Sequence, residues 1–77
     1  MQNHVASVDL HSLLSPREHQ VLAATALGLT NSEVAQRLGV SVHAVKFHLA
    51  GIYRKLGVAN RTEAAVAYAT RHAAEPH

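Results

Sequence analysis

The sequence predicts an all-α protein, a compact four-helix domain that contains a helix-turn-helix. Three observations predict this fold class. Side-chain capping signals for helix starts recur along the chain, and apolar residues with helical spacing follow each of them. No stretch alternates with period two for long enough to form a strand. Aromatic residues make up only 4% of the 77 residues although 48% are hydrophobic, a composition that favours short, closely packed helices.

The first two predicted helices begin at capping boxes. The run Ser15–Glu18 combines Ser and Glu three positions apart with a proline at the first helical position, and Gly28 ends this helix. The run Thr30–Glu33 repeats the capping pattern and opens a short helix that ends at Gly39.

Ser41 then caps a longer helix over residues 42–56, which stops at Gly57. The run Asn60–Glu63 opens a fourth helix, which we expect to reach about His72. We therefore predict one domain over residues 13–72, a flexible arm or linker end at 1–12 and a flexible tail at 73–77.

The helical period assigns each helix an inward face. The residues expected to face inward are Val21, Leu22 and Thr25 in the first helix, Val34, Ala35 and Leu38 in the second, Val42, Val45, Leu49, Ile52 and Leu56 in the third, and Thr62, Ala65, Val66 and Ala69 in the fourth.

The charge pattern is compatible with a polyanionic partner. The formal charge is only +2, but no acidic residue lies between Glu33 and Glu63, whereas five lysines and arginines do. A solvated basic face without a partner would explain the charge pattern alone equally well. Residues 39–41 decide between the two, because a short helix, a tight turn with glycine and a longer helix form the helix-turn-helix unit.

The second face of the helix over 42–56 has the mixture of side chains that the major groove of DNA requires. Lys46 can donate to a guanine edge, Phe47 can contact a thymine methyl or a sugar, and Ala50 permits close approach. His43 lies on the same face, so we predict these four as the base-facing residues.

Other polar residues flank this face and are predicted to contact the phosphate backbone. They are Asn31, Arg37, Ser41, Arg54, Lys55 and Arg61.

These motifs resemble the LuxR/GerE-type helix-turn-helix domain, the effector domain of NarL/FixJ-type response regulators. The matching pieces over residues 14–69 are LSPREHQVL, GLTNSEVAQRLGVS, VKFH, KLGV and NRTEAAVAYA. The resemblance implies sequence-specific binding to double-stranded DNA, regulation of bacterial transcription, and a homodimer on two half-sites. It also assigns Lys46, Phe47 and Ala50 to base-facing positions, and the region of Asn31 together with Arg54 and Lys55 to backbone-contacting ones.

The sequence departs from the family pattern at two kinds of position. Ala44 stands where the family usually has Thr, and Ala50 and Gly51 replace side chains that are often polar. A glycine inside a helix costs about 1 kcal/mol relative to alanine.

The resemblance also implies dimerisation, often through the fourth helix. The face of that helix predicted to point outward is rich in small residues, which permit a close helix–helix approach. The predicted interface residues are Ala64, Ala67, Tyr68 and Arg71.

Several other function classes find no support. Seven histidines have no metal-ligand spacing, the candidate serine nucleophiles are explained as caps, and no cofactor motif is present, so we predict neither an enzyme nor a metal site. The absence of cysteine fits a reducing cytoplasm, and no apolar run is long enough to cross a membrane. Two alternatives stay open, a sigma-factor region-4-like promoter-binding domain and a helical protein-interaction module. RNA polymerase is a further partner compatible with a transcription regulator.

Overall fold

The computed structural model describes residues 13–74, with side chains up to residue 70. The helices in this part are α2 (Pro16–Ala26), α3 (Asn31–Leu38), α4 (Val42–Leu56) and α5 (Arg61–Ala74). Residues 13–74 contain no strand, which confirms the predicted all-α class. The helix α5 runs slightly further than predicted. The predicted arm at 1–12 and most of the predicted tail lie outside the described residues.

The local capping signals act as the sequence predicts. Ser15 and Glu18 form a complete capping box at the start of α2, and Thr30 and Glu33 form another at the start of α3. Gly39 ends α3 with φ of 69°, a left-handed conformation that costs other residues about 1–2 kcal/mol. A different geometry ends α2, where Leu27 caps the helix in a right-handed conformation and Gly28 follows with φ of 92°.

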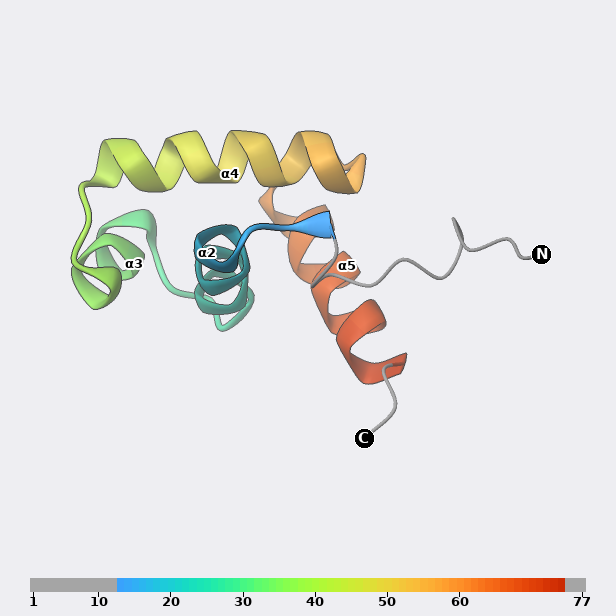
Figure 1. Ribbon diagram of the computed structural model, residues 1–77. Helices are drawn as coiled ribbons and strands as arrows, with labels where there is room; N and C mark the ends of the chain where they lie inside the picture. The colour runs from blue at the N-terminus through green and yellow to red at the C-terminus, as the bar shows by residue number, and fades with distance from the viewer. Residues whose placement is uncertain (1–12, 75–77) are drawn as a thin grey trace.

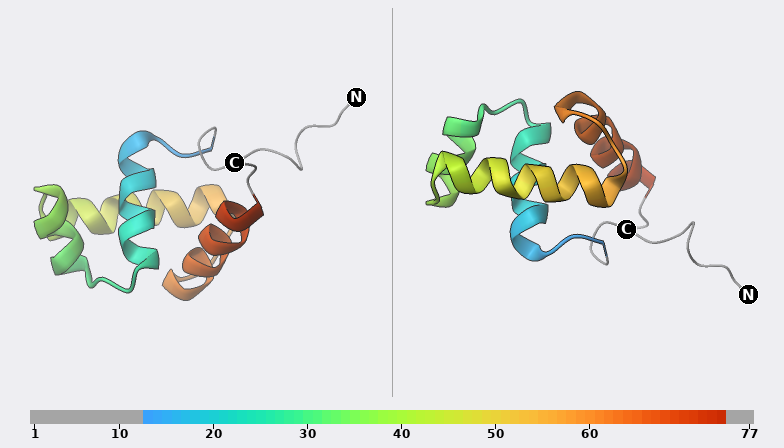
Figure 2. Two further views of the ribbon diagram at one scale, coloured as in Figure 1. Left: turned by 90° about the horizontal axis from the view of Figure 1, so that it is seen from below. Right: turned by 90° about the horizontal axis from the view of Figure 1, so that it is seen from above.

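The helix α4 lies across α2 and α3, and α5 packs against α2 near the far end of α4 (Figure 1). Seen from above, no other described element covers the outer side of α4 (Figure 2). The tight turn between α3 and α4 holds these two helices at an angle, as the helix-turn-helix arrangement requires. The fold therefore presents one long helix along one side of the molecule.

The core is small and aliphatic, and its largest fully buried side chains are Leu22, Ile52, Val21, Val34 and Val45. Burying each such side chain contributes about 1.5–3 kcal/mol. The predicted inward faces of the first three helices are confirmed, since their members are buried or pack against this core. The inward stripe of α4 thus determines which of its side chains remain outside.

The predicted orientation of α5 is wrong. Ala64, expected on the outer face, is fully buried, and Tyr68 packs against the core, whereas Val66, expected inside, is 60% exposed. Thr62 and Ala69 are also exposed. The physical reason is that small alanine side chains occur on both faces of this helix, so the apolar period is ambiguous. Packing of the helices instead places Ala64 in the core, where its small side chain permits a close approach.

Candidate nucleic-acid interface

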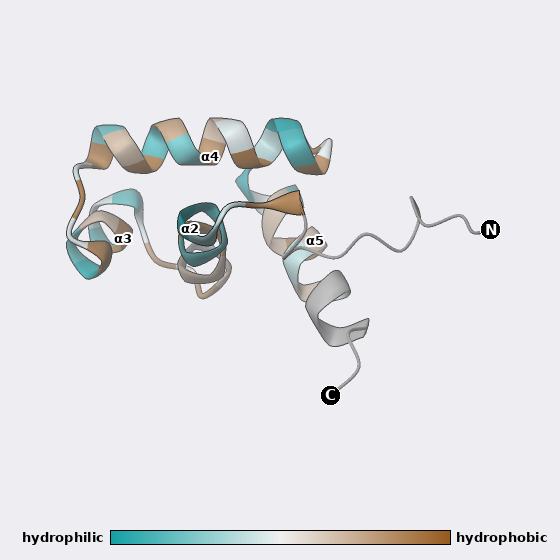
Figure 3. Ribbon diagram, viewed as in Figure 1, coloured by the Kyte–Doolittle hydropathy of each residue, from teal (hydrophilic) through white to brown (hydrophobic). Residues whose placement is uncertain are grey.

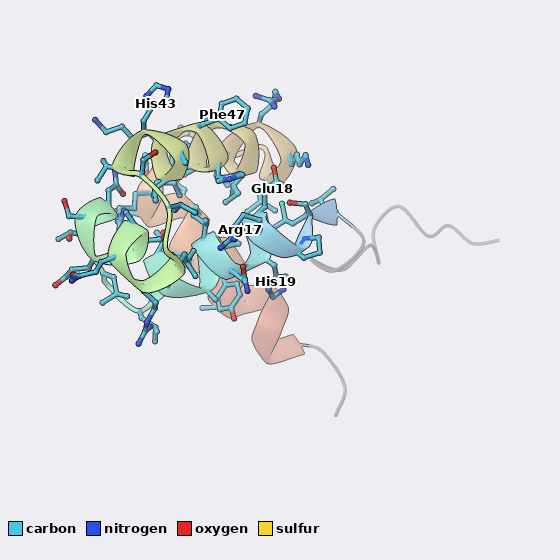
Figure 4. All side chains as sticks on the ribbon, turned by 60° about the vertical axis from the view of Figure 1, so that its left-hand side comes forward. Arg17, Glu18, His19, His43 and Phe47 are labelled. Atoms are coloured by element: carbon cyan, nitrogen blue, oxygen red, sulfur yellow. The ribbon has the colours of Figure 1, made fainter. Side chains whose placement is uncertain are left out.

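The outer side of α4 carries the residues that the sequence predicts to face bases. His43, Lys46, Phe47 and Ala50 are all exposed. His43 and Phe47 project from α4 on the side away from α2 (Figure 4). Phe47 is 72% exposed, and its ring meets that of the neighbouring His48 edge-on at a centroid distance of 5.8 Å. Phe47 therefore places a large apolar ring on the same exposed face of α4 as His43 and Lys46.

Hydrophilic and hydrophobic residues are interspersed along the whole length of α4 (Figure 3). The first turn of α4 has no acidic residue, and its last turn carries two cations, Arg54 and Lys55. Ser41 accepts a hydrogen bond from the backbone N–H of Ala44 at 3.0 Å, which fixes the start of the helix. Ser41 itself is exposed beside this first turn, where it was predicted to meet a phosphate.

Among the described side chains, Arg37, Lys46 and Arg54 are exposed cations with no hydrogen bond or ion pair inside residues 13–74. Arg37 belongs to the last turn of α3, and Lys46 and Arg54 belong to α4. Their charges are therefore available to an anion that approaches the helix-turn-helix.

Lys55, predicted as a phosphate contact, forms an ion pair with Glu18, with 2.8 Å between Nζ and Oε1. Glu18 is 8% exposed, and the same oxygen accepts the backbone N–H of Ser15 at 2.9 Å. Burial acts to raise the pKa of Glu18, but the bonds from Lys55 and Ser15 outweigh it, so the pKa lies below its ordinary value. Glu18 is therefore ionised at neutral pH.

Gly51 is buried where α4 passes closest to this carboxylate. A Cβ atom at Gly51 would lie 3.0 Å from Oε2 of Glu18 and 3.7 Å from the guanidinium of Arg54. The glycine therefore leaves room for the carboxylate against α4, which explains a residue that is unfavourable in a helix interior.

Arg61, also predicted to contact phosphate, bonds within the domain. Its guanidinium donates to Oδ1 of Asn31 at 2.9 Å and to the carbonyl oxygen of Leu29. The structure thus brings together two predicted backbone contacts, Asn31 and Arg61, at the start of α3.

Sequence reasoning missed Arg17. Its guanidinium donates to the carbonyl oxygen of Leu38 at 3.4 Å. This hydrogen bond joins the start of α2 to the end of α3. A cation at a helix C-terminus is favourable because it meets the negative end of the helix dipole. No signal in the sequence pairs these residues, which lie 21 positions apart.

The predicted dimer residues are only partly at the surface. Ala64 is buried and therefore cannot contribute to an interface, while Ala67 and Tyr68 are half-buried. The side chain of Arg71 lies outside the described residues. The outer face of α5 instead presents Thr62, Val66 and Ala69.

Among the side chains that the structure describes, up to residue 70, no three histidine or carboxylate groups gather where they could hold a metal ion. The helices in the same part of the chain are too short or too polar to cross a membrane.

Residues 12–68 match the family model described as bacterial regulatory proteins, luxR family. The chain belongs to the LuxR family. It is a DNA-binding helix-turn-helix domain of transcriptional regulators, and this family is not one of enzymes. The prediction from the sequence motifs is thereby confirmed.

The chain is similar to transcriptional regulators of several bacteria. The chain is 51% identical over 51 residues to the probable transcriptional regulatory protein SgaR of Hyphomicrobium methylovorum, covering 66% of the chain and 24% of that relative. It is 42% identical over 62 residues to the transcriptional regulatory protein LiaR of Bacillus subtilis, covering 80% of the chain and 29% of that relative. It is also 45% identical over 58 residues to the putative regulator YhjB of Escherichia coli, covering 75% of the chain and 28% of that relative. The chain therefore spans less than a third of the length of these LuxR-family relatives.

Proposed function

We propose that this LuxR-family domain recognises a specific DNA sequence by laying α4 in the major groove. The observation that carries the proposal is the exposed face of α4, which combines cations with an aromatic ring and a small residue. A groove-reading helix needs this combination, because cations bind guanine edges and phosphates while apolar groups contact thymine methyls.

Within this proposal, Lys46, Phe47, Ala50 and His43 face the bases. Arg37 and Arg54 contact phosphates on either side of them, and Ser41 with the free N–H groups at the start of α4 adds a neutral phosphate contact. Asn31 lies at the start of α3, where the helix terminus offers further donors.

We further propose a homodimer on two half-sites, formed through the outer face of α5. The strip of Thr62, Val66 and Ala69 follows helical spacing, and Val66 is a large apolar side chain left 60% exposed. Small neighbours on the strip permit two such helices to approach closely. We also propose that the domain acts in the bacterial cytoplasm as the effector part of a response regulator, with RNA polymerase as a partner of the whole protein.

Selection of bound duplexes from random DNA tests the proposal, because it reveals the half-site and the spacing together. We expect a pseudo-palindrome whose half-sites lie about one helical turn, 10–10.5 base pairs, apart. Recovery of no enriched sequence would contradict specific recognition. A promoter-element sequence that is bound by single copies would favour the sigma-factor-like alternative.

Lys46→Ala tests base reading by α4. We expect the binding free energy for the selected site to weaken by about 1–3 kcal/mol, because a base-edge contact is lost. Binding to random-sequence duplex should weaken less. Fluorescence anisotropy on both duplexes measures the two losses, and equal losses would assign Lys46 to phosphate instead.

A further inference from the structure

Six lysine and arginine side chains lie in the described part of the chain, and they fall into two groups. Arg17, Lys55 and Arg61 each bond to another element of the domain. Arg37, Lys46 and Arg54 are exposed and bond to nothing within residues 13–74. Sequence position does not separate the groups, since Arg54 and Lys55 are neighbours.

The three bonded cations link the start of α3, the end of α3 and the end of α4 to other parts of the domain. Arg61 of α5 binds the loop before α3 and the first residue of that helix. Arg17 of α2 binds the last residue of α3. Lys55 joins the last turn of α4 to α2 through Glu18. Together these bonds link both ends of α3 and the far end of α4 to the rest of the domain.

A cation that is already bonded in this way contributes little to a phosphate contact. Lys55 would have to leave a nearly buried carboxylate, which would then lose its charge partner. Arg61 is half-buried and would leave the carbonyl oxygen of Leu29 without its guanidinium donor. A free, exposed cation makes the same contact without breaking a bond. Contact with DNA through Arg37, Lys46 and Arg54 is therefore more favourable than contact through the bonded cations.

We propose that Arg37, Lys46 and Arg54 are the cations that meet DNA, and that Arg17, Lys55 and Arg61 are positioning residues that hold α3 and α4 in place. This division rests on the proposed function. It assigns a different role to Lys55 and Arg61 than family position and charge suggest, and it adds Arg17 to the residues on which DNA binding depends.

The salt dependence of DNA binding distinguishes the two groups. Each phosphate neutralised by a cation adds about −0.9 to the slope of log K against log[salt]. On a random-sequence duplex, where Lys46 finds no cognate base edge to read and meets phosphate instead, the three exposed cations contribute about −2.7 per bound chain, whereas six would contribute about −5.4. The measurement is fluorescence anisotropy of the 77-residue chain on a random-sequence duplex, between about 50 and 200 mM KCl.

Arg61→Gln and Arg61→Lys form one pair of variants, with Arg54→Gln as the matched control from the other group. Arg54→Gln should reduce the slope by about 0.9 per chain. Both Arg61 variants should lower the affinity by about three- to thirtyfold while the slope keeps its wild-type value. Arg61→Lys fails to rescue because an ammonium group lacks the planar fork that reaches both acceptors.

A second set of variants tests the same division of the cations if an Arg61 variant does not fold. It consists of Lys55→Gln, Glu18→Gln and the combination of the two. A positioning Lys55 acts through Glu18, so the combined variant should bind about as well as either single variant, each with the wild-type slope. Thermal unfolding followed by circular dichroism establishes that each variant is folded at the assay temperature.

A slope reduced by about 0.9 in Arg61→Gln or Lys55→Gln would overturn the division, and so would full rescue of affinity by Arg61→Lys. These results would leave DNA binding itself intact. A flat salt response of the wild-type chain would instead contradict the proposed function, so the two failures are distinguishable.

Discussion

Glu18 ties the start of α2 to the last turn of α4. One of its oxygens accepts both the backbone N–H of Ser15 and the ammonium of Lys55, and the other lies against the bare backbone of Gly51. The carboxylate therefore serves as a helix cap and as an inter-helix link at the same time. Capping α2 fixes the carboxylate at a position close to α4, so α4 needs a residue without a side chain, Gly51, at that point.

The lowered pKa of Glu18 leads to a prediction about acid stability. A carboxyl group with a lowered pKa stabilises the fold at neutral pH, and this stabilisation is lost as the pH falls through that pKa. Glu18→Gln keeps a cap acceptor but removes the charge, so it should lower the free energy of unfolding at pH 7 by about 0.2–1 kcal/mol. Urea unfolding at pH 7 and at about pH 3 measures the difference from wild type. An equal difference at both pH values would contradict this role.

At the level of elements, α4 has one face that packs in the core and another that is exposed and is the proposed DNA-binding face. Ile52 is completely buried, whereas Phe47 is 72% exposed. The two faces belong to one rigid helix with a side-chain cap at Ser41 and a left-handed glycine at its end. Substitutions on one face should therefore affect the other little.

Phe47→Ala and Ile52→Ala test this division of α4. Phe47→Ala should change the free energy of unfolding by less than about 0.5 kcal/mol, as for other exposed sites, yet weaken binding to the selected DNA by about 1 kcal/mol or more. Ile52→Ala should destabilise the fold by about 2–5 kcal/mol because it leaves a cavity. Chemical unfolding and anisotropy give both quantities. A large loss of stability in Phe47→Ala would show that the ring supports the fold.

At the level of the whole molecule, α5 joins the proposed dimer surface to the helix-turn-helix. It packs against α2 and buries Ala64, its first residue Arg61 binds the start of α3, and Val66 remains exposed. A second copy seated on α5 would therefore fix the distance between two copies of α4. This distance sets the spacing of half-sites on DNA.

Val66→Asp should weaken the dimer without unfolding the chain, since the side chain is already mostly in water and a charge opposes burial between two copies. We expect at least a tenfold loss of affinity for DNA with two half-sites, about 1.4 kcal/mol, and a much smaller loss on a single half-site. Sedimentation on both duplexes measures stoichiometry and affinity. Unchanged two-site binding would exclude this face of α5 as the interface.

The sequence by itself determined the helices, their caps, the helix-turn-helix and the outward face of α4. These features depend on interactions between residues a few positions apart, such as Thr30 with Glu33, and on a clear apolar period. Exposure of Phe47 followed from the same period, because the opposite side of α4 is continuously aliphatic.

Only the tertiary structure decided which face of α5 points inward and which cations are already bonded. The bonds of Lys55 and Arg61 to Glu18 and Asn31 span 37 and 30 residues, so they depend on the angles at which the helices pack. Gly51 is explained only by the carboxylate that lies against it. Local sequence patterns contain no information about such contacts, because they arise only after the core has set one helix against another.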